Sequence, residues 1–150
     1  MKEQKVVVAP HEVDTIITDW TTAKVMCDPR MTGAKGMSAV SLYFEPGQGH
    51  ARHNHEESEQ IIFVVSGEGE QIVELEPGKI VKQKLSAGSL VFIPKGAYHS
   101  TFNTGWEPMR VLAVFSPPGP EAFMREMGDT GGIGAQELRV VPAGEVPKRR

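Results

Sequence analysis

The sequence predicts an all-β protein, on two observations. First, short apolar or alternating runs recur along the chain. They are Thr15–Asp19, Ser38–Phe44, Ile61–Val65, Gln71–Leu75, Ile80–Leu85, Leu90–Ile93, Ser100–Asn103 and Met109–Phe115. Second, turn residues separate these runs. They include Pro46-Gly47, Gly67-Glu68-Gly69, Pro77-Gly78, Ala87-Gly88, Pro94-Lys95-Gly96, Thr104-Gly105 and Pro117-Pro118. Many short strands at this spacing are typical of a β-sandwich or β-barrel.

The N-terminal segment is expected to contribute strands within residues 5–34. Its first apolar stretch, Val6 to Ala9, stops at Pro10 and is too short for the core of a signal peptide. No later stretch is long enough to span a bilayer. We therefore expect no membrane association and a cytoplasmic location.

The middle of the chain contains one clear hairpin. Gln71–Leu75 and Lys79–Leu85 are joined by Pro77-Gly78, a pair that favours a tight turn. At 150 residues the chain can bury a core as one domain, and we expect a single domain over residues 1–150.

One short helix is expected near the C-terminus. Pro120 suits a first helical position, Phe123 and Met127 lie four apart on one face, and Gly128 suits the position after the last turn. The stretch from Asp129 to Arg150 is rich in Gly, Pro and charge. We expect it to be an extended arm that lies against a partner subunit.

Composition excludes several function classes. A single cysteine, Cys27, rules out an internal disulfide and a zinc cluster built on thiolates, and we expect it to be buried as a small apolar residue. The net charge of −3 and pI near 6.0 argue against a nucleic-acid-binding surface, which needs clustered Lys and Arg.

The first segment with candidate functional residues contains His53 and His55. Residues two apart in a strand point to the same face, so the two imidazoles would lie side by side, as neighbouring metal ligands do. A polar strand end facing water has the same pattern. His50 precedes the pair, and we expect a turn histidine in water, with an acid–base role at the rim of the site as the alternative.

A second segment adds a third imidazole. The apolar strand Leu90–Ile93 runs into a turn at Pro94 and Gly96, and His99 begins the next strand. This turn would return His99 to the end of the preceding strand. The chain has only five histidines.

Together the two segments resemble the two signature motifs of the cupin superfamily. The matching positions in the first motif are Gly47, His53, His55 and Gly67, and those in the second are Gly88, Pro94, Gly96, His99 and Asn103. The resemblance implies a double-stranded β-helix, or jelly-roll barrel, with a metal in its mouth. It also implies assembly as a homodimer, to which we expect the N-terminal strands or the Asp129–Arg150 arm to contribute. The barrel core would cover about residues 35–118, with the helix and arm in 119–150.

The resemblance leaves the fourth metal ligand open between two residues. The motif spacing places Gln60 where the family usually has a glutamate, whereas Glu59 is the acidic neighbour. Adjacent strand residues face opposite sides, so only one of them points inward. The alternation does not decide between them, and the spacing favours Gln60.

The expected site is one divalent transition metal (Zn, Ni, Fe, Mn or Cu) on His53, His55, Gln60 and His99. Three imidazoles and an amide are neutral, so the metal keeps its charge, which favours Lewis-acid chemistry. We expect a metal-dependent enzyme acting on a small polar or anionic molecule, of the isomerase, lyase or cyclase type. The alternatives are a dioxygenase of the quercetin or cysteine dioxygenase type and a non-enzymatic cupin that binds a small ligand.

Overall fold

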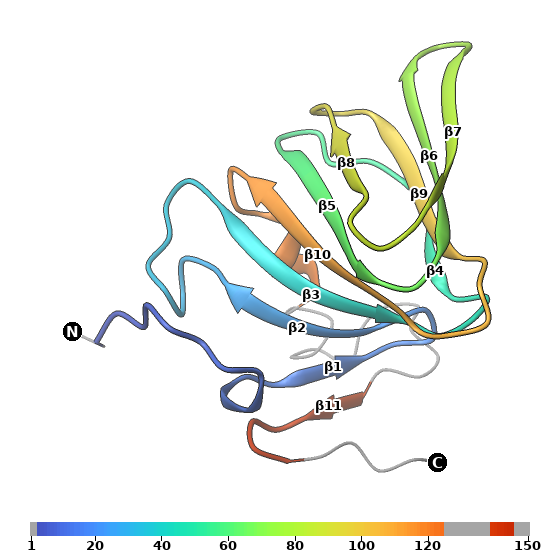
Figure 1. Ribbon diagram of the computed structural model, residues 1–150. Coiled ribbons are helices and arrows are strands. Elements are labelled where there is room, and N and C mark those ends of the chain that lie inside the picture. Colours follow the sequence, from blue (N-terminus) through green and yellow to red (C-terminus); the bar gives the residue numbers. More distant parts are fainter. Residues whose placement is uncertain (1–2, 125–138, 146–150) are drawn as a thin grey trace.

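The structure is a computed structural model that describes residues 3–124 and 139–145 (Figure 1). In these ranges the chain forms two antiparallel sheets, of seven strands in the order β11-β1-β2-β3-β10-β5-β8 and of four in the order β4-β9-β6-β7. The strands are β1 (Thr15–Ile17), β2 (Thr22–Cys27), β3 (Ser38–Phe44), β4 (Gly49–His53), β5 (Glu59–Ser66), β6 (Gly69–Glu76), β7 (Lys79–Leu85), β8 (Leu90–Ile93), β9 (Tyr98–Asn103), β10 (Met109–Ser116) and β11 (Arg139–Val141). The two antiparallel sheets confirm the predicted all-β jelly-roll fold.

The core lies between the two sheets and follows the alternation of the strands. In β3 and β10 every second residue is buried, including Val40, Phe44, Met109 and Val111. The outward residues of β7 are exposed along almost its whole length, because β7 is the outer strand of the smaller sheet. The predicted hairpin is confirmed as β6 and β7, joined at Pro77-Gly78.

Several predicted runs are confirmed, and three strands, β2, β4 and β11, have no predicted run. Ser38–Phe44 and Leu90–Ile93 have the expected bounds, and the other predicted runs differ at their ends. The predicted runs omit β2, which pairs with β1 and β3, and β4, a largely polar strand that pairs with β9. Cys27 is half-buried rather than buried, and its Sγ lies 3.2 Å from Thr32 Oγ1.

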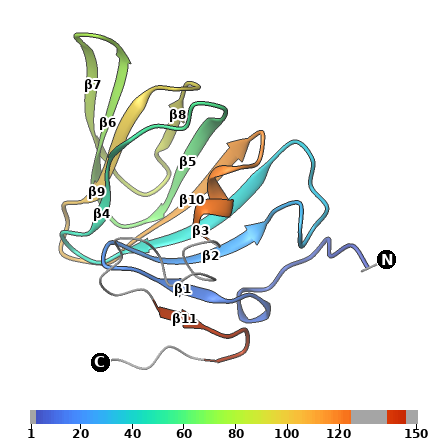
Figure 2. The ribbon, with the colours of Figure 1, turned by 180° about the vertical axis from the view of Figure 1, so that it is seen from behind.

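The C-terminal region contains a helix that begins at Pro120 and is described as far as residue 124. Figure 2 shows this helix beside β3 and β10. Met127 and Gly128, which the sequence places at its end, lie outside the described residues. Of the expected arm, residues 139–145 are described, and β11 within them pairs with β1 of the same chain. The rest of the arm lies outside the described residues. No helix in the described residues has the length and apolar character needed to cross a membrane.

Asn103 fixes the end of the barrel that is far from the three histidines. Its Nδ2 donates to the carbonyl oxygens of Phe44 at 3.0 Å and Glu107 at 2.8 Å, and its Oδ1 accepts from the amide of Gly105 at 2.9 Å. This motif residue therefore ties β9 to β3 and to the turn before β10, and its role in the structure is to close the far end.

Candidate metal centre

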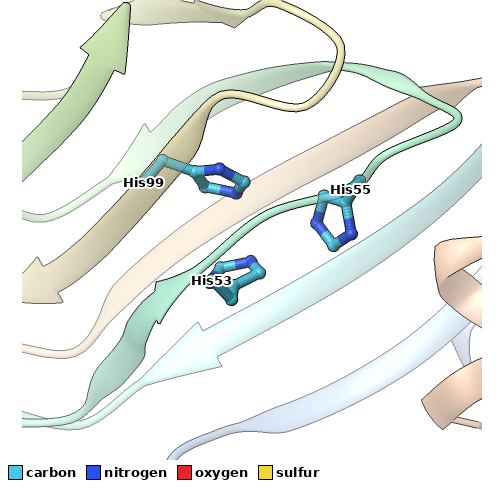
Figure 3. A group of neighbouring side chains, drawn as sticks. All are labelled: His53, His55 and His99. Atoms are coloured by element: carbon cyan, nitrogen blue, oxygen red, sulfur yellow. The ribbon is translucent and has the colours of Figure 1, made fainter. Parts of the chain in front are cut away.

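Two strand ends and one loop bring the three predicted histidines together. His53 at the end of β4 is paired in register with His99 on β9. His55 follows in the loop, where its carbonyl oxygen accepts from the amide of Gly96 at 2.9 Å. The candidate ligand atoms of the three imidazoles lie within 4.8 Å of one another (Figure 3). His55 thus reaches the cluster from beyond the strand, and not from the same regular strand as His53.

Backbone carbonyls orient two of these rings. His53 Nδ1 lies 2.6 Å from the carbonyl oxygen of Ala51, and His99 Nδ1 lies 2.9 Å from that of Ala97. A carbonyl only accepts, so each Nδ1 carries the hydrogen and each Nε2 keeps its lone pair. His99 Nε2 is buried and has no hydrogen-bond partner among the described residues. Histidines that bind metals are commonly held in this way, with one nitrogen donating and the other free to coordinate.

Gln60 points into the barrel and Glu59 points out. In β5 the exposed and buried residues alternate from Glu59 onward, and Gln60 is 5% exposed. Gln60 Oε1 is buried and has no hydrogen-bond partner in the described part of the chain. Burying a carbonyl oxygen without a partner costs free energy. The strand therefore presents the amide, and not the carboxylate, to the interior.

Burial keeps the histidines neutral. Loss of solvent lowers the pKa of His53 to about 3 and that of His55 to about 4, with a smaller contribution from the neighbouring imidazole of His99. Burial likewise lowers the pKa of His99. All three are then unprotonated near pH 7, which is the form that coordinates metals.

A cavity of about 250 Å³ opens beside the histidines. Its volume corresponds to roughly eight water molecules at their share of liquid volume. Its lining combines polar and apolar side chains. It is lined by Trp20, Val40, Leu42, His50, His53, Asn54, His55, Gln60, Phe115, Pro120, Glu121, Phe123 and Met124. The shape and lining suit a small organic ligand with polar groups at its ends.

His50 corrects an expectation, because it is not a turn histidine in water. It lies on β4, and its ring stacks on Trp20 at 4.1 Å and on His53 at 3.4 Å between centroids. A register shift in β4 between His50 and His53 lets both residues face the cavity, although they are three apart. Burial, followed by repulsion from His53, lowers the pKa of His50 to about 2.

Three further cavity residues are missed by sequence reasoning. Asn54 follows the end of β4 and lines the cavity, and its Nδ2 donates to the carbonyl oxygen of Gly96 at 3.3 Å. Trp20 precedes β2, and Glu121 lies on the helix. No local pattern marks Trp20 or Glu121 as cavity residues. Arg52, between His50 and His53 on β4, is not part of the lining and makes two hydrogen bonds to Glu74.

Comparisons with known proteins identify a family model and relatives that this chain resembles. The model of the cupin domain family matches residues 40–115. A putative germin-like protein 9-2 of Oryza sativa subsp. japonica is 30% identical over 112 residues, which are 75% of this chain and 50% of that protein. A glucose-6-phosphate isomerase of Thermococcus onnurineus is 26% identical over 74% of this chain and 55% of its own length.

Among solved structures, the formate complex of an oxalate decarboxylase from Lactobacillus farciminis superimposes with a TM-score of 0.66 and 25% identity. The match covers 71% of this chain and 32% of that one. The chain spans about half the length of the curated relatives it matches.

Proposed function

This chain belongs to the cupin family, and from that premise we propose that it is a metal-dependent enzyme. It would act on a small polar or anionic organic molecule by non-redox, Lewis-acid chemistry of the isomerase, lyase or cyclase type. One observation carries the proposal. His99 Nε2 and Gln60 Oε1 are both buried without partners in the described residues, in a barrel that also brings His53 and His55 beside His99.

These atoms fit a metal ion by their chemistry. Imidazole nitrogens suit zinc, nickel, iron and copper, and an amide oxygen is a neutral ligand that borderline ions also accept. A bound ion would satisfy both orphaned atoms, which otherwise destabilise the fold. We propose that His53, His55, His99 and Gln60 hold one divalent transition metal of the set Zn, Ni, Fe, Mn or Cu.

The neutral donor set favours the non-redox reaction. A bound metal supplies Lewis-acid polarisation of a substrate oxygen, or a water of lowered pKa. The carbonyls of Ala51 and Ala97 keep two imidazoles oriented, and Gln60 adds no negative charge. Val40, Leu42 and Phe115 line the cavity with apolar surface, which excludes competing water.

The compared proteins agree with a small anionic substrate. One relative is named an isomerase of a sugar phosphate, and one solved structure is a decarboxylase of a dicarboxylate with formate present. Both names describe those proteins. For this chain they support a substrate with a carboxylate, phosphate or related oxygen group near the metal.

A substrate screen on metal-loaded protein tests the reaction class. Protein purified without a histidine tag would be analysed for bound metals and then incubated with small hydroxy acids, keto acids and sugar acids. NMR would follow conversion, and an electrode would follow oxygen. We expect conversion without oxygen uptake. Conversion that consumes oxygen in a fixed ratio would support the dioxygenase instead, and tight binding without conversion would support a binding protein.

We also infer a homodimer from the cupin resemblance. A second copy would find apolar surface on the outer side of β5 and β8. There Ile61 pairs with Phe92, and Phe63 pairs with Leu90, and all four are exposed. Light scattering at micromolar concentration should give the mass of a dimer, and a monomer would contradict the inference.

A further inference from the structure

Glu121 places a buried carboxylate on the wall of the metal-site cavity. Glu121 is only 4% exposed, and its side chain lines the same cavity as His53, His55 and Gln60. It comes from the C-terminal helix, whereas the histidines come from β4, β9 and the loop after β4. The cavity wall therefore carries a carboxylate that comes from a different part of the fold than the proposed metal ligands.

Two donors hold this carboxylate in place. Ser38 Oγ donates to Glu121 Oε2 at 2.6 Å, and the amide of Gly119 donates to the same oxygen at 2.8 Å. A carboxylate can accept about four hydrogen bonds over its two oxygens. Within the described part of the chain, both bonds fall on Oε2, which leaves accepting capacity on the carboxylate.

The carboxylate of Glu121 differs in charge from the histidines and Gln60 that line the same cavity. The imidazoles are neutral, and Gln60 is an amide. A buried carboxylate is costly unless it is paired or hydrogen-bonded. An amide at position 121 could accept the same bonds from Ser38 and Gly119 without that cost. A carboxylate here is useful if a ligand brings a donor or a positive charge to it.

We propose that Glu121 is a specificity-determining residue that accepts a hydrogen bond from a hydroxyl or ammonium group of the ligand. The opposite end of that ligand, a carboxylate or enolate, would lie at the histidine cluster. The apolar lining of the cavity, including Val40, Leu42 and Phe115, fits a short hydrocarbon segment. The substrate class is then a small hydroxy acid or amino acid, and not a dianion, because Glu121 repels a second negative charge. This inference rests on the proposed function, since it takes the histidine end as the anion-binding end.

Calorimetry on the zinc-loaded full chain tests the inference with matched probes. Each pair has the same number of heavy atoms and differs only in its tail: 3-aminopropionate against butyrate, 3-hydroxypropionate against butyrate, and 4-aminobutyrate against pentanoate. A hydrogen bond to a charged group contributes enough to change affinity by about tenfold or more. We expect wild type to prefer the donor-tailed member of at least one pair by that factor.

Variants then assign the preference to one side chain. Glu121→Gln keeps the shape and an acceptor for Ser38 but loses the charge, so the preference for the ammonium tail should fall by about tenfold while the methyl-tailed probe is unaffected or binds more tightly. Glu59→Gln is the matched control, because Glu59 is an exposed carboxylate on β5, and it should behave as wild type. Circular dichroism and zinc content would be measured on both variants.

The outcomes separate this inference from the proposed function. A wild type that binds carboxylates without any tail preference overturns the role of Glu121, whether or not the variant folds. A Glu121→Gln protein that keeps the preference for the ammonium tail shows that Glu121 only anchors the helix to β3, and overturns it as well. For the hydroxyl tail the same conclusion follows if Glu121→Met, which has no oxygen acceptor, keeps the preference. A zinc-loaded wild type that binds no carboxylate better than the metal-free protein overturns the proposed function and this inference with it.

Discussion

The two ends of the barrel interior are built from the same strands but differ in chemistry. At the far end, Phe44, Val64 and Met109 are almost fully buried and apolar. At the near end, β5 presents Gln60, four residues before Val64, and β9 presents His99, four residues before Asn103. One end stabilises the fold by packing, and the other presents buried polar atoms that have no hydrogen-bond partner among residues 3–124 and 139–145.

The far end also has no spare volume. A Cβ added at Gly69 would lie 2.6 Å from the carbonyl oxygen of Phe102 and 2.7 Å from Met109 Sδ. The near end contains the cavity of about 250 Å³. The difference teaches that folding and ligand chemistry are separated along the barrel axis. Substitutions at one end should change the free energy of unfolding, and substitutions at the other should change metal or ligand binding.

The largest effect should come from His99→Ala. It removes the most buried of the three imidazoles and should weaken metal binding by more than about 100-fold, since even residues that only orient a ligand contribute 10- to 100-fold. Metal content by mass spectrometry and zinc titration would measure this. The free energy of unfolding of the metal-free protein should change less in His99→Ala than in Met109→Ala. Full retention of metal would show that His99 is not a metal ligand.

Met109→Ala should have the opposite profile. Met109 is 0% exposed, and removing its side chain should lower the free energy of unfolding by about 2–5 kcal/mol. Urea denaturation would measure the loss, and the folded protein should keep its metal stoichiometry. Ile80→Ala on β7 is the matched control, because Ile80 is 59% exposed and its loss should cost no more than about 0.5 kcal/mol. Loss of metal from folded Met109→Ala would show that the two ends are coupled.

Acid should lower the free energy of unfolding of the metal-free protein, because the histidines at the near end are buried in their neutral form. The pKa values of His53 and His55 are lowered from 6.5 to about 3 and about 4, so the unfolded chain binds more protons between pH 6.5 and about 4. Stability is therefore full above pH 6.5 and decreases as the pH falls through this window. Urea midpoints at pH 7.5, 6.0 and 5.0 would show the slope. His55→Ala should reduce the slope, and an unchanged slope would contradict this origin.

The smallest effects should distinguish the two neighbours on β5. Gln60→Glu adds a negative charge inside the barrel and should weaken acetate binding to the zinc-loaded protein by about tenfold, while it strengthens metal binding. Glu59→Gln alters an exposed carboxylate and should change either affinity by less than about twofold. If Glu59→Gln is damaging and Gln60→Glu is silent, Glu59 is the ligand and the dioxygenase reaction becomes the better proposal.

Much of the fold could be predicted because its determinants are local. The alternating pattern in Ser38–Phe44 and the apolar run Leu90–Ile93 predict strands with the observed bounds, and Pro77-Gly78 predicts the observed hairpin. β2 and β4 are harder to recognise, since β4 is largely polar and β2 mixes Thr and Lys with its apolar residues. These strands form because neighbouring strands pair with them.

The sequence by itself determined the barrel and the three histidines, because strand alternation, turns and motif spacing act over short distances along the chain. Only the tertiary structure decided that Gln60 faces inward, that His50 stacks on Trp20 and His53, and that Glu121 reaches the cavity. Ser38 and Glu121 are 83 residues apart when they hydrogen-bond. A contact at that separation depends on how the helix packs against the sheet, and no short pattern in the sequence encodes it.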